Sequence, residues 1–240
     1  MCTVSWVRHL AGYDLFFNRD ESRQRLTATP PEICEIRGGR AIRPIDTDAG
    51  GTWIWVNSYG LTACLLNNYQ AYGSIPTVPV SRGVFLASFI NSRDVEEIRG
   101  ALREQSLADY YPFLLLGVDN QSELLAVWDG RELSITSPHT VASPICSSGF
   151  APEEIIPYRQ KLYQEMVGKA GEPSAQLLQA FHEQHDANKP AHSVLMSRTD
   201  AQTVSMSRVM VKTDTITFQY RPVSESGRLL NSTEVSIDRG

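Results

Sequence analysis

The apolar and polar positions at the beginning of the chain predict a short β-hairpin. Residues 3–8 and 13–17 are rich in β-branched and aromatic side chains, and an Ala-Gly turn lies between them. A hairpin this short brings the end of its second strand beside the first residues of the chain. We therefore expect the polar run at 18–21 to lie close to Cys2.

The pattern changes several times between the hairpin and the helical part of the chain. Residues 27–51 are rich in Pro, Gly and charge, which predicts a long irregular connection. Side chains that alternate in character over residues 52–57, followed by the apolar run 61–67, predict a second hairpin. The segment 69–82 contains Gly and two Pro residues, so we expect a loop able to cover a pocket. At the other end, residues 224–240 form either a last strand or a loose end.

Helical spacing then alternates with short β segments. Apolar residues at helical intervals predict one helix from Ser92 or Asp94 to Leu107. Two more helices are predicted, one over 152–167 that accommodates a Pro and one over 174–185 that begins at a Ser cap. The predicted strands of this part are 113–118, 124–128, 132–136, 204–212 and 215–220. The pattern as a whole indicates a mixed α and β protein.

Composition narrows the class of protein without naming a function. A chain of 240 residues is long enough for a sizeable core, and we expect one domain over residues 1–240. A net charge of −5 argues against a partner such as nucleic acid or an anionic membrane. The sequence has no apolar run long enough for a membrane span and shows no secretory signal, so we expect a cytoplasmic protein.

The four cysteines are Cys2, Cys34, Cys64 and Cys146, and none forms a CxxC pair. Their dispersal argues against a compact zinc site and suits reduced thiols in the cytoplasm. Cys64 lies in an apolar run and is expected to pack as a small hydrophobe, whereas Cys34 and Cys146 fall in predicted loops. No phosphate-binding glycine motif follows a predicted strand, so we expect neither a metal nor another cofactor.

Cys2 directly follows Met1, and its side chain is small enough for Met1 to be removed by the usual aminopeptidase. Removal leaves one residue with both a thiol and a free α-amine, which is the arrangement of a nucleophile activated by its own amine. The α-amine has an ordinary pKa of about 7.7–8.0, so a fraction is unprotonated at neutral pH. Arg19 could then lower the thiol pKa and Asp20 could hold the α-ammonium. The alternative is a charged, solvated loop at 18–21.

Several short motifs occur in one order between Met1 and Gly83. They are Met1-Cys2-Thr3, Asn18-Arg19-Asp20-Glu21, Gly50-Gly51-Thr52-Trp53, Leu66-Asn67-Asn68-Tyr69 and Ser81-Arg82-Gly83. In these motifs the chain resembles the NRDE family, which includes the transport and Golgi organisation protein 2 and many bacterial relatives. That family is similar to the cysteine N-terminal nucleophile (Ntn) hydrolases, such as bile salt hydrolases and penicillin V acylases. The resemblance returns weakly at 203–217.

The resemblance implies an α+β fold, namely a four-layer αββα sandwich of two mainly antiparallel sheets covered by helices. It also implies amide hydrolysis, in which the α-amine of Cys2 accepts the thiol proton and the thiolate attacks an acyl carbon. In that scheme Arg19 and Asp20 tune and orient Cys2. Bile salt hydrolases carry their Arg earlier relative to the Asp, so Arg19 departs from their pattern.

An oxyanion that forms during this attack needs preorganised donors. Asn68 directly precedes Tyr69 and matches the position where related Ntn hydrolases place an oxyanion-hole Asn; Asn67 is the competing choice, and both could instead bond a turn. Trp53 could line an apolar pocket, although aromatic residues on alternating strand positions more often belong to a core. The candidate substrate-binding residues are Asn18, Trp53, Asn67, Tyr69, His139 and Arg208.

One histidine motif remains outside this scheme. His182-Glu183-Gln184-His185 is one residue short of the HExxH pattern, so it predicts an exposed polar helix face rather than a metal site. His139 lies in a predicted loop and could also pair with a cysteine as in papain-like enzymes, but no supporting spacing accompanies it.

Two main functions are therefore consistent with the sequence. The first is a cysteine Ntn-type amidohydrolase that acts on a small acyl amide or peptide-like ligand. The alternative is a binding or trafficking protein that uses the same pocket for a hydrophobic, acyl or haem-like ligand. A third, weaker option is a redox-responsive thiol protein that oxidises Cys2 reversibly.

Overall fold

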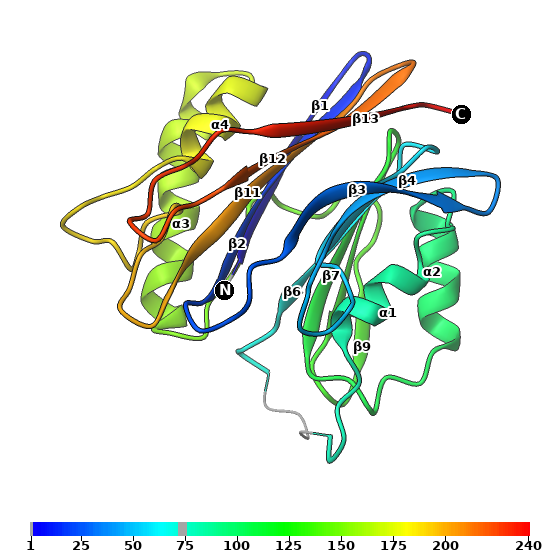
Figure 1. Cartoon of the computed structure of the whole chain (residues 1–240), viewed down its shortest axis with the longest axis horizontal. Coiled ribbons are helices and arrows are strands. Elements are labelled where there is room, and N and C mark those ends of the chain that lie inside the picture. Colours follow the sequence, from blue (N-terminus) through cyan, green and yellow to red (C-terminus); the bar gives the residue numbers. More distant parts are fainter. Residues whose placement is uncertain (1, 72–75) are drawn as a thin grey trace. The chain divides into compact units, whose positions relative to one another are not determined.

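The computed structural model describes residues 2–71 and 76–240, and it divides into two compact units (Figure 1). The first unit contains the chain as far as Arg25 together with Ala142–Met210 and Gln219–Glu234. The second contains Leu26–Val141, Val211–Phe218 and Val235–Gly240. The single domain predicted over residues 1–240 stays a prediction. The loop predicted over 69–82 falls in part on residues 72–75, which lie outside the described residues.

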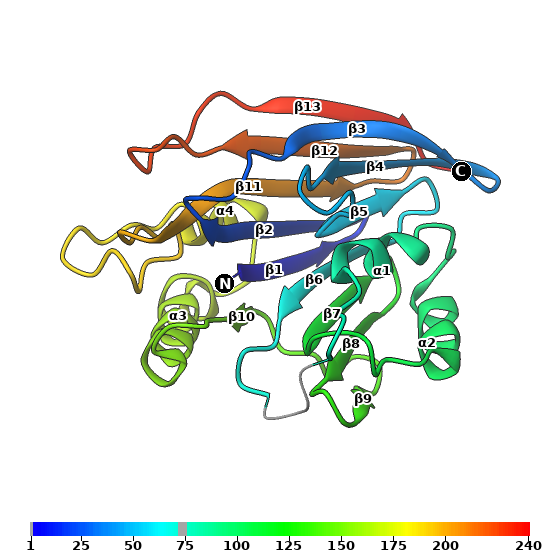
Figure 2. The same ribbon diagram turned by 60° about the horizontal axis from the view of Figure 1, so that its bottom comes forward.

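The first sheet has six strands in the order β10-β1-β2-β11-β12-β13 (Figure 2). The predicted N-terminal hairpin is confirmed, since antiparallel pairing joins Cys2 to Arg19 at one end and His9 to Gly12 at the other. β13 shows that the C-terminal segment ends in a strand. The bounds are β1 Cys2–His9, β2 Gly12–Ser22, β10 Ile145–Ser147, β11 Ala201–Val211, β12 Thr215–Pro222 and β13 Thr233–Asp238.

Two α-helices accompany this sheet, α3 (Pro152–Met166) and α4 (Ala175–His182), with a short 3-10 turn at Gly168–Ala170 between them. α4 packs on β1 and β2, and α3 packs against β10 and α4. Their apolar faces and β2 share one core cluster, which gives both helices a fixed position over the hairpin. Its buried members are Phe16, Tyr163, Val167, Leu178, Phe181 and Val194.

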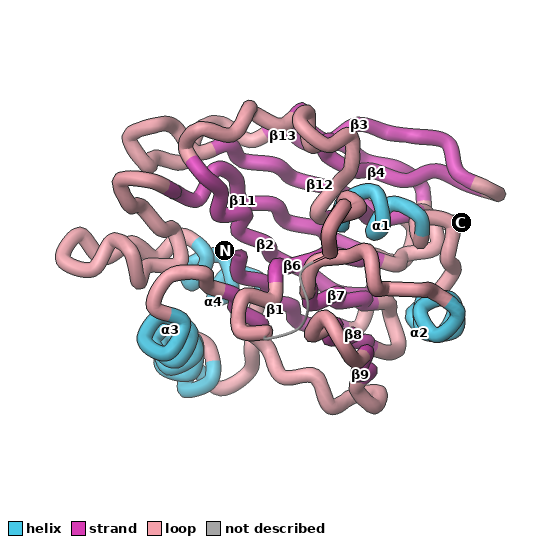
Figure 3. The backbone as a smooth tube through the Cα atoms, turned by 90° about the horizontal axis from the view of Figure 1, so that it is seen from below, coloured by secondary structure: helices cyan, strands magenta, loops and turns pink. Residues whose placement is uncertain are grey.

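The second sheet has seven strands in sequence order, and each neighbouring pair is antiparallel (Figure 3). Its core cluster includes the fully buried Trp55, whose indole N–H donates to the carbonyl of Leu86. The bounds are β3 Thr29–Ile36, β4 Gly39–Ile45, β5 Ile54–Asn57, β6 Thr62–Asn67, β7 Phe113–Val118, β8 Glu123–Trp128, β9 Leu133–Ile135, α1 Arg82–Ser88 and α2 Val95–Glu104.

The irregular connection predicted over 27–51 is wrong, because β3 and β4 form a hairpin there. β3 contains Pro30 and Pro31, yet it lies at the edge of its sheet, where a missing backbone donor is tolerated. The loop positions predicted for Cys34 and Cys146 are also wrong, since these residues lie in β3 and β10. α1 was not predicted at all; Ser81 caps it by accepting a hydrogen bond from the backbone N–H of Val84.

The predicted fold class is confirmed. Two antiparallel sheets and four α-helices in the described part of the chain make this an α+β protein. Among these helices, none combines the length and the apolar character that crossing a membrane requires. The hairpin of β1 and β2 positions Cys2 opposite Arg19 and next to the strand residue Asp20.

Candidate functional site

Antiparallel pairing at the end of the first hairpin positions the predicted nucleophile. Cys2 lies opposite Arg19 on β2 and opposite Ser147 on β10, so strands flank it on both sides. Its side chain is partly buried, whereas Arg19 and Asp20 are 6% and 3% exposed. The alternative of a solvated loop at 18–21 is therefore wrong, and Asp20 follows Arg19 on β2 at the end of the strand pairing. Met1 lies outside the described residues.

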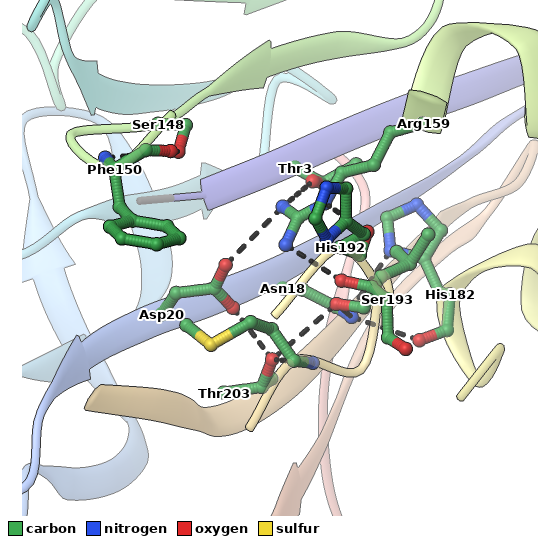
Figure 4. Close-up of polar contacts among 12 residues, drawn as sticks. Thr3, Asn18, Asp20, Ser148, Phe150, Arg159, His182, His192, Ser193 and Thr203 are labelled. Carbon is green, nitrogen blue, oxygen red and sulfur yellow. Dashed lines mark hydrogen bonds and ion pairs between the residues drawn. The ribbon is translucent and has the colours of Figure 1, made fainter. Parts of the chain in front are cut away.

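The carboxylate of Asp20 is held from two directions (Figure 4). The hydroxyl of Thr203 on β11 donates to its Oδ1 at 2.6 Å, and Nη1 of Arg159 on α3 donates to its Oδ2 at 3.3 Å. The side chains of Asp20 and Arg159 are both 0% exposed, so this ion pair is fully removed from water. A buried pair of this kind fixes orientation more surely than it adds stability.

Arg159 connects α3 to several other segments through its remaining donors (Figure 4). Nη1 also donates to the hydroxyl of Thr3 at 2.8 Å. Nη2 donates to the carbonyl of Ser193 at 2.7 Å, and Nε donates to that of His192 at 3.3 Å. One guanidinium thus joins β1, β2, α3 and the segment before β11.

Asn18, a candidate substrate-binding residue, belongs to a second buried network. Its amide donates to the carbonyls of His182 and Val194 at 2.9 and 3.0 Å, and its Oδ1 lies 3.0 Å from Nδ1 of His182. Nε2 of His182 lies 2.8 Å from the hydroxyl of Ser5. The structure therefore directs the Asn18 side chain into a network with α4 and β1.

Burial raises the pKa of the Cys2 thiol, and the charge of Asp20 raises it further. A backbone hydrogen bond from Asp20 and the charge of Arg19 act in the opposite direction. The expected effect of Arg19 thus has the right sign, but burial outweighs it. Cys2 is consequently a protonated thiol at neutral pH.

Burial also raises the pKa of Asp20, against the opposing effects of Arg159 and of the hydrogen bond from Thr203. On β10, opposite Thr3 of β1, burial raises the pKa of Cys146 to about 11, so this thiol is inert at neutral pH. Burial lowers the pKa of His182 to about 3, with the Arg159 charge as a further cause, so its ring is neutral. The exposed helix face predicted for the His182–His185 motif is wrong at His182, which is fully buried.

We expect acid to destabilise the protein through His182. Its folded pKa lies below its ordinary value of 6.5, so its stabilising contribution is complete above pH 6.5 and is lost as the pH falls towards 3. The free energy of unfolding should therefore fall by about 1.4 kcal/mol per pH unit within this window. Urea unfolding at several pH values gives the free energy of unfolding as a function of pH. This free energy should fall less steeply with acid in His182→Gln than in the parent, while His185→Gln, at an exposed position, serves as control. Equal slopes in all three proteins would contradict the assignment.

Arg208 lies in the same unit but at the other end of the hairpin. Its Nε and Nη2 both lie 2.8 Å from Oδ1 of Asp14, and its guanidinium lies over the ring of Phe16. Asp14 precedes Arg19 by five residues of β2, a separation of about 17 Å along the strand. The structure thus brings Cys2, Arg19 and Asp20 together, and it places Arg208 away from them.

The other sequence-based candidates lie in the second unit. The amide of Asn68 donates to the carbonyl of Trp128 at 3.3 Å, and the amide of Asn67 donates to the hydroxyl of Tyr69 at 2.6 Å. Trp53 is 7% exposed. His139 is exposed in a turn and has a φ of 60°.

Sequence reasoning missed Arg159 and Thr203, although one signal for Arg159 was present. Ile155, Arg159 and Tyr163 recur at intervals of four residues along the predicted helix, and all three are buried on one face. An arginine on the apolar face of a helix requires a buried partner. Thr203 offered no such signal, because a threonine is ordinary in a strand. Among the described residues, no group of three His, Cys, Asp or Glu side chains could hold a metal ion.

Comparison with solved structures shows which fold this arrangement belongs to. The C2A mutant of conjugated bile acid hydrolase from Clostridium perfringens matches with a TM-score of 0.61 and 13% identity, over 99% of this chain and 92% of that chain. A second variant of that hydrolase, with leucine in place of an arginine, matches with a TM-score of 0.60 and 14% identity over the same shares. The Caenorhabditis elegans N-acylethanolamine-hydrolyzing acid amidase ortholog has a TM-score of 0.58 and 10% identity, over 89% and 93%.

These structures are Ntn hydrolases, so the chain has an Ntn-hydrolase-like fold, as the sequence motifs implied. No curated protein matches the chain by sequence. The family model described as Transport and Golgi organisation 2 matches residues 1–226. This match covers nearly the whole chain, and the protein therefore belongs to the Transport and Golgi organisation 2 (TANGO2) family.

Proposed function

We propose that this protein is a cysteine N-terminal nucleophile amidohydrolase that cleaves the C–N bond of a small acyl amide. The observation that carries the proposal is the position of Cys2 at the end of the hairpin, beside a carboxylate that Arg159 and Thr203 hold in place. Two proteins of similar fold are named for hydrolysis, one as a conjugated bile acid hydrolase and one as an N-acylethanolamine-hydrolyzing acid amidase. They support the reaction class and leave the acyl group of this protein's substrate open.

In the proposed reaction, the α-amine of mature Cys2 removes the thiol proton while sulfur bonds to the acyl carbon. The raised thiol pKa makes this base necessary, since little thiolate exists beforehand. The tetrahedral intermediate then breaks its C–N bond, and the leaving amine takes the proton. Water, deprotonated by the same α-amine, then attacks the thioester; the C–S bond breaks, the carboxylic acid leaves, and the sulfur of Cys2 takes the proton back from the α-ammonium. Asp20 orients the α-amine, and Arg19 opposes the effect of burial on the thiol.

We assign the oxyanion donor to Asn68, with Asn67 as the competing choice. A side-chain amide at a strand end is a suitable preorganised donor, and β6 ends at Asn67. Trp53, Tyr69, His139, Asn18 and Arg208 remain proposed substrate-binding residues. The cytoplasmic location is likewise a proposal, supported by four cysteines that are all free thiols.

We expect intact mass spectrometry to find that Met1 is absent and that Cys2 forms an acyl-enzyme. The protein should be incubated with p-nitrophenyl acyl esters and N-acyl amides of increasing chain length and then quenched in acid. The expected adduct has the mass of the acyl group and is released by hydroxylamine, because it is a thioester. Cys34→Ala should form the same adduct, since Cys34 is the other partly buried thiol. Retained Met1, or an adduct that persists in Cys2→Ala, would contradict the proposal.

One observation favours the alternative of a non-catalytic binding protein. The raised pKa of the Cys2 thiol makes the residue unreactive unless its α-amine is free. A protein that retains Met1 would therefore keep the fold and bind a hydrophobic, acyl or haem-like ligand without turnover. The same mass measurement separates the two functions, because binding leaves no covalent adduct.

A further inference from the structure

In the proposed reaction, the buried guanidinium of Arg159 only holds the carboxylate of Asp20 in place. It comes from α3, far along the chain from the nucleophile, and yet its Nη1 contacts both Thr3 and Asp20, the residues that follow Cys2 and Arg19. Its side chain is 0% exposed. A fully buried cation is costly, so its charge calls for an explanation beyond helix packing.

The hairpin register indicates what that charge acts on. Cys2 pairs with Arg19, and Asp20 is the next residue of β2, at the end of the ladder where the α-amine of mature Cys2 lies. Oδ1 of Asp20 accepts from Thr203 and Oδ2 accepts from Arg159. Each carboxylate oxygen can accept more than one hydrogen bond, so Asp20 can hold the α-amine as well.

A carboxylate alone beside the α-amine would work against catalysis. A neighbouring negative charge favours the protonated ammonium and raises the pKa of the amine. An ammonium cannot remove the thiol proton, so the base would be lost at neutral pH. A second cation on the same carboxylate has the opposite effect, because it offsets the negative charge and repels a proton from the amine. A guanidinium keeps its charge at every working pH, so the offset is constant.

We propose that Arg159 is a positioning residue that offsets the charge of Asp20, so that the α-amine of mature Cys2 is unprotonated near neutral pH and can act as the base. The inference rests on the proposed function, since it presupposes that Met1 is removed. It adds to that function a residue from α3 that acts through Asp20 and does not touch the reacting atoms. Asp20 thus orients the amine, and the charge of Arg159 offsets the effect by which Asp20 would raise the pKa of the amine and keep it protonated.

Several other ionisable groups of this unit surround the pair. Arg19 and Glu21 form an ion pair of 3.3 Å on β2, and His192 pairs with Glu154 at 3.5 Å. The His182 ring and the thiols of Cys2 and Cys146 are neutral at pH 7, because burial lowers the pKa of the ring and raises the pKa of both thiols. The charge of Asp20 or of Arg159 acts on Cys2, Cys146 and His182, and Arg19 lies opposite Cys2.

The α-amine can be titrated directly, without measuring hydrolysis. Cys2→Ala removes the competing thiol and keeps a small second residue, so Met1 should still be removed. Competitive acetylation with acetic anhydride from pH 5 to 10, followed by mass spectrometry of the N-terminal peptide, reports the amine pKa. We expect Arg159→Met in this background to raise that pKa by about one unit. Arg159→Lys, which retains the charge, should leave the pKa close to that of the parent.

A second pair of variants keeps the test decisive if Arg159→Met does not fold. Asp20→Asn removes the negative charge, and Asp20→Asn with Arg159→Met removes both charges. The amine pKa should be lower in Asp20→Asn than in the double variant, because only the single variant retains the cation. A purely structural Arg159 would change stability in each background and leave the amine titration unmoved.

The outcomes separate the inference from the function on which it rests. An α-amine found on Met1 would overturn both. Removal of Met1 with the same amine pKa in folded Arg159→Met, Arg159→Lys and the parent would overturn only the role of Arg159. The inference would be supported if the amine pKa is raised in Arg159→Met and falls back towards the parent value in the double variant Asp20→Asn with Arg159→Met.

Discussion

Cys2→Ala is expected to lower amide hydrolysis by about 10⁴-fold or more, because it removes the only nucleophile in the proposed reaction. Any residual rate would come from substrate binding and the oxyanion donors alone. Folding should change little, since Cys2 is only partly buried and lies at the start of β1. The measurement is the initial rate on whichever acyl amide forms the acyl-enzyme, together with the midpoint of thermal unfolding.

Two further variants give this expectation its controls. Cys34→Ala removes a thiol of similar exposure from β3, and it should retain full activity. Cys2→Ser keeps a small second residue, so Met1 should still be removed and the α-amine should be free. Its hydroxyl replaces the thiol nucleophile, and turnover should therefore be lost. Hydrolysis that survives in Cys2→Ala at more than a few per cent of the parent rate would show that another residue attacks the substrate.

The sequence predicted those parts of the site that depend on neighbouring residues. The hairpin of β1 and β2 has a short turn, so the alternation of its side chains was enough to bring Cys2 and Asp20 together. The same reasoning found the helices α2, α3 and α4, because each has apolar residues at helical spacing. The family motifs supplied the fold class, which local pattern alone leaves at mixed α and β.

The unpredicted parts depend on contacts between residues far apart in the sequence. The bonds of Arg159 to Asp20 and Thr3 span 139 and 156 residues, and the bond of Thr203 to Asp20 spans 183. Local pattern carries no information about such partners. His182 shows the same limit in reverse, since a polar motif predicted exposure and tertiary packing buried it between Phe16 and Phe181. Likewise, the Pro residues of β3 led to the prediction of an irregular connection where the structure has an edge strand.

Asp20→Ala is expected to lower the free energy of unfolding by about 3–5 kcal/mol, because it leaves the guanidinium of Arg159 buried without its carboxylate. The hydroxyl of Thr203 also loses its acceptor, since it donates to Oδ1 of Asp20 in the intact protein. Asp20→Asn should cost less, because its amide oxygen still accepts from Arg159. Urea unfolding at pH 7, fitted with a common m-value, measures the difference.

The double variant Asp20→Ala with Arg159→Met decides whether the unpaired charge is the cause. If it is, removing the cation as well should recover much of the lost stability, because methionine fills similar space without a charge to solvate. A double variant whose loss of stability relative to the parent equals the sum of the two single losses would show that the two residues act independently. Recovery in the double variant would show that Arg159 and the carboxylate of Asp20 stabilise the fold as a pair, and Arg159 also opposes the effect of burial, which raises the pKa of that carboxylate. That carboxylate is the group that the proposed mechanism places beside the α-amine of Cys2.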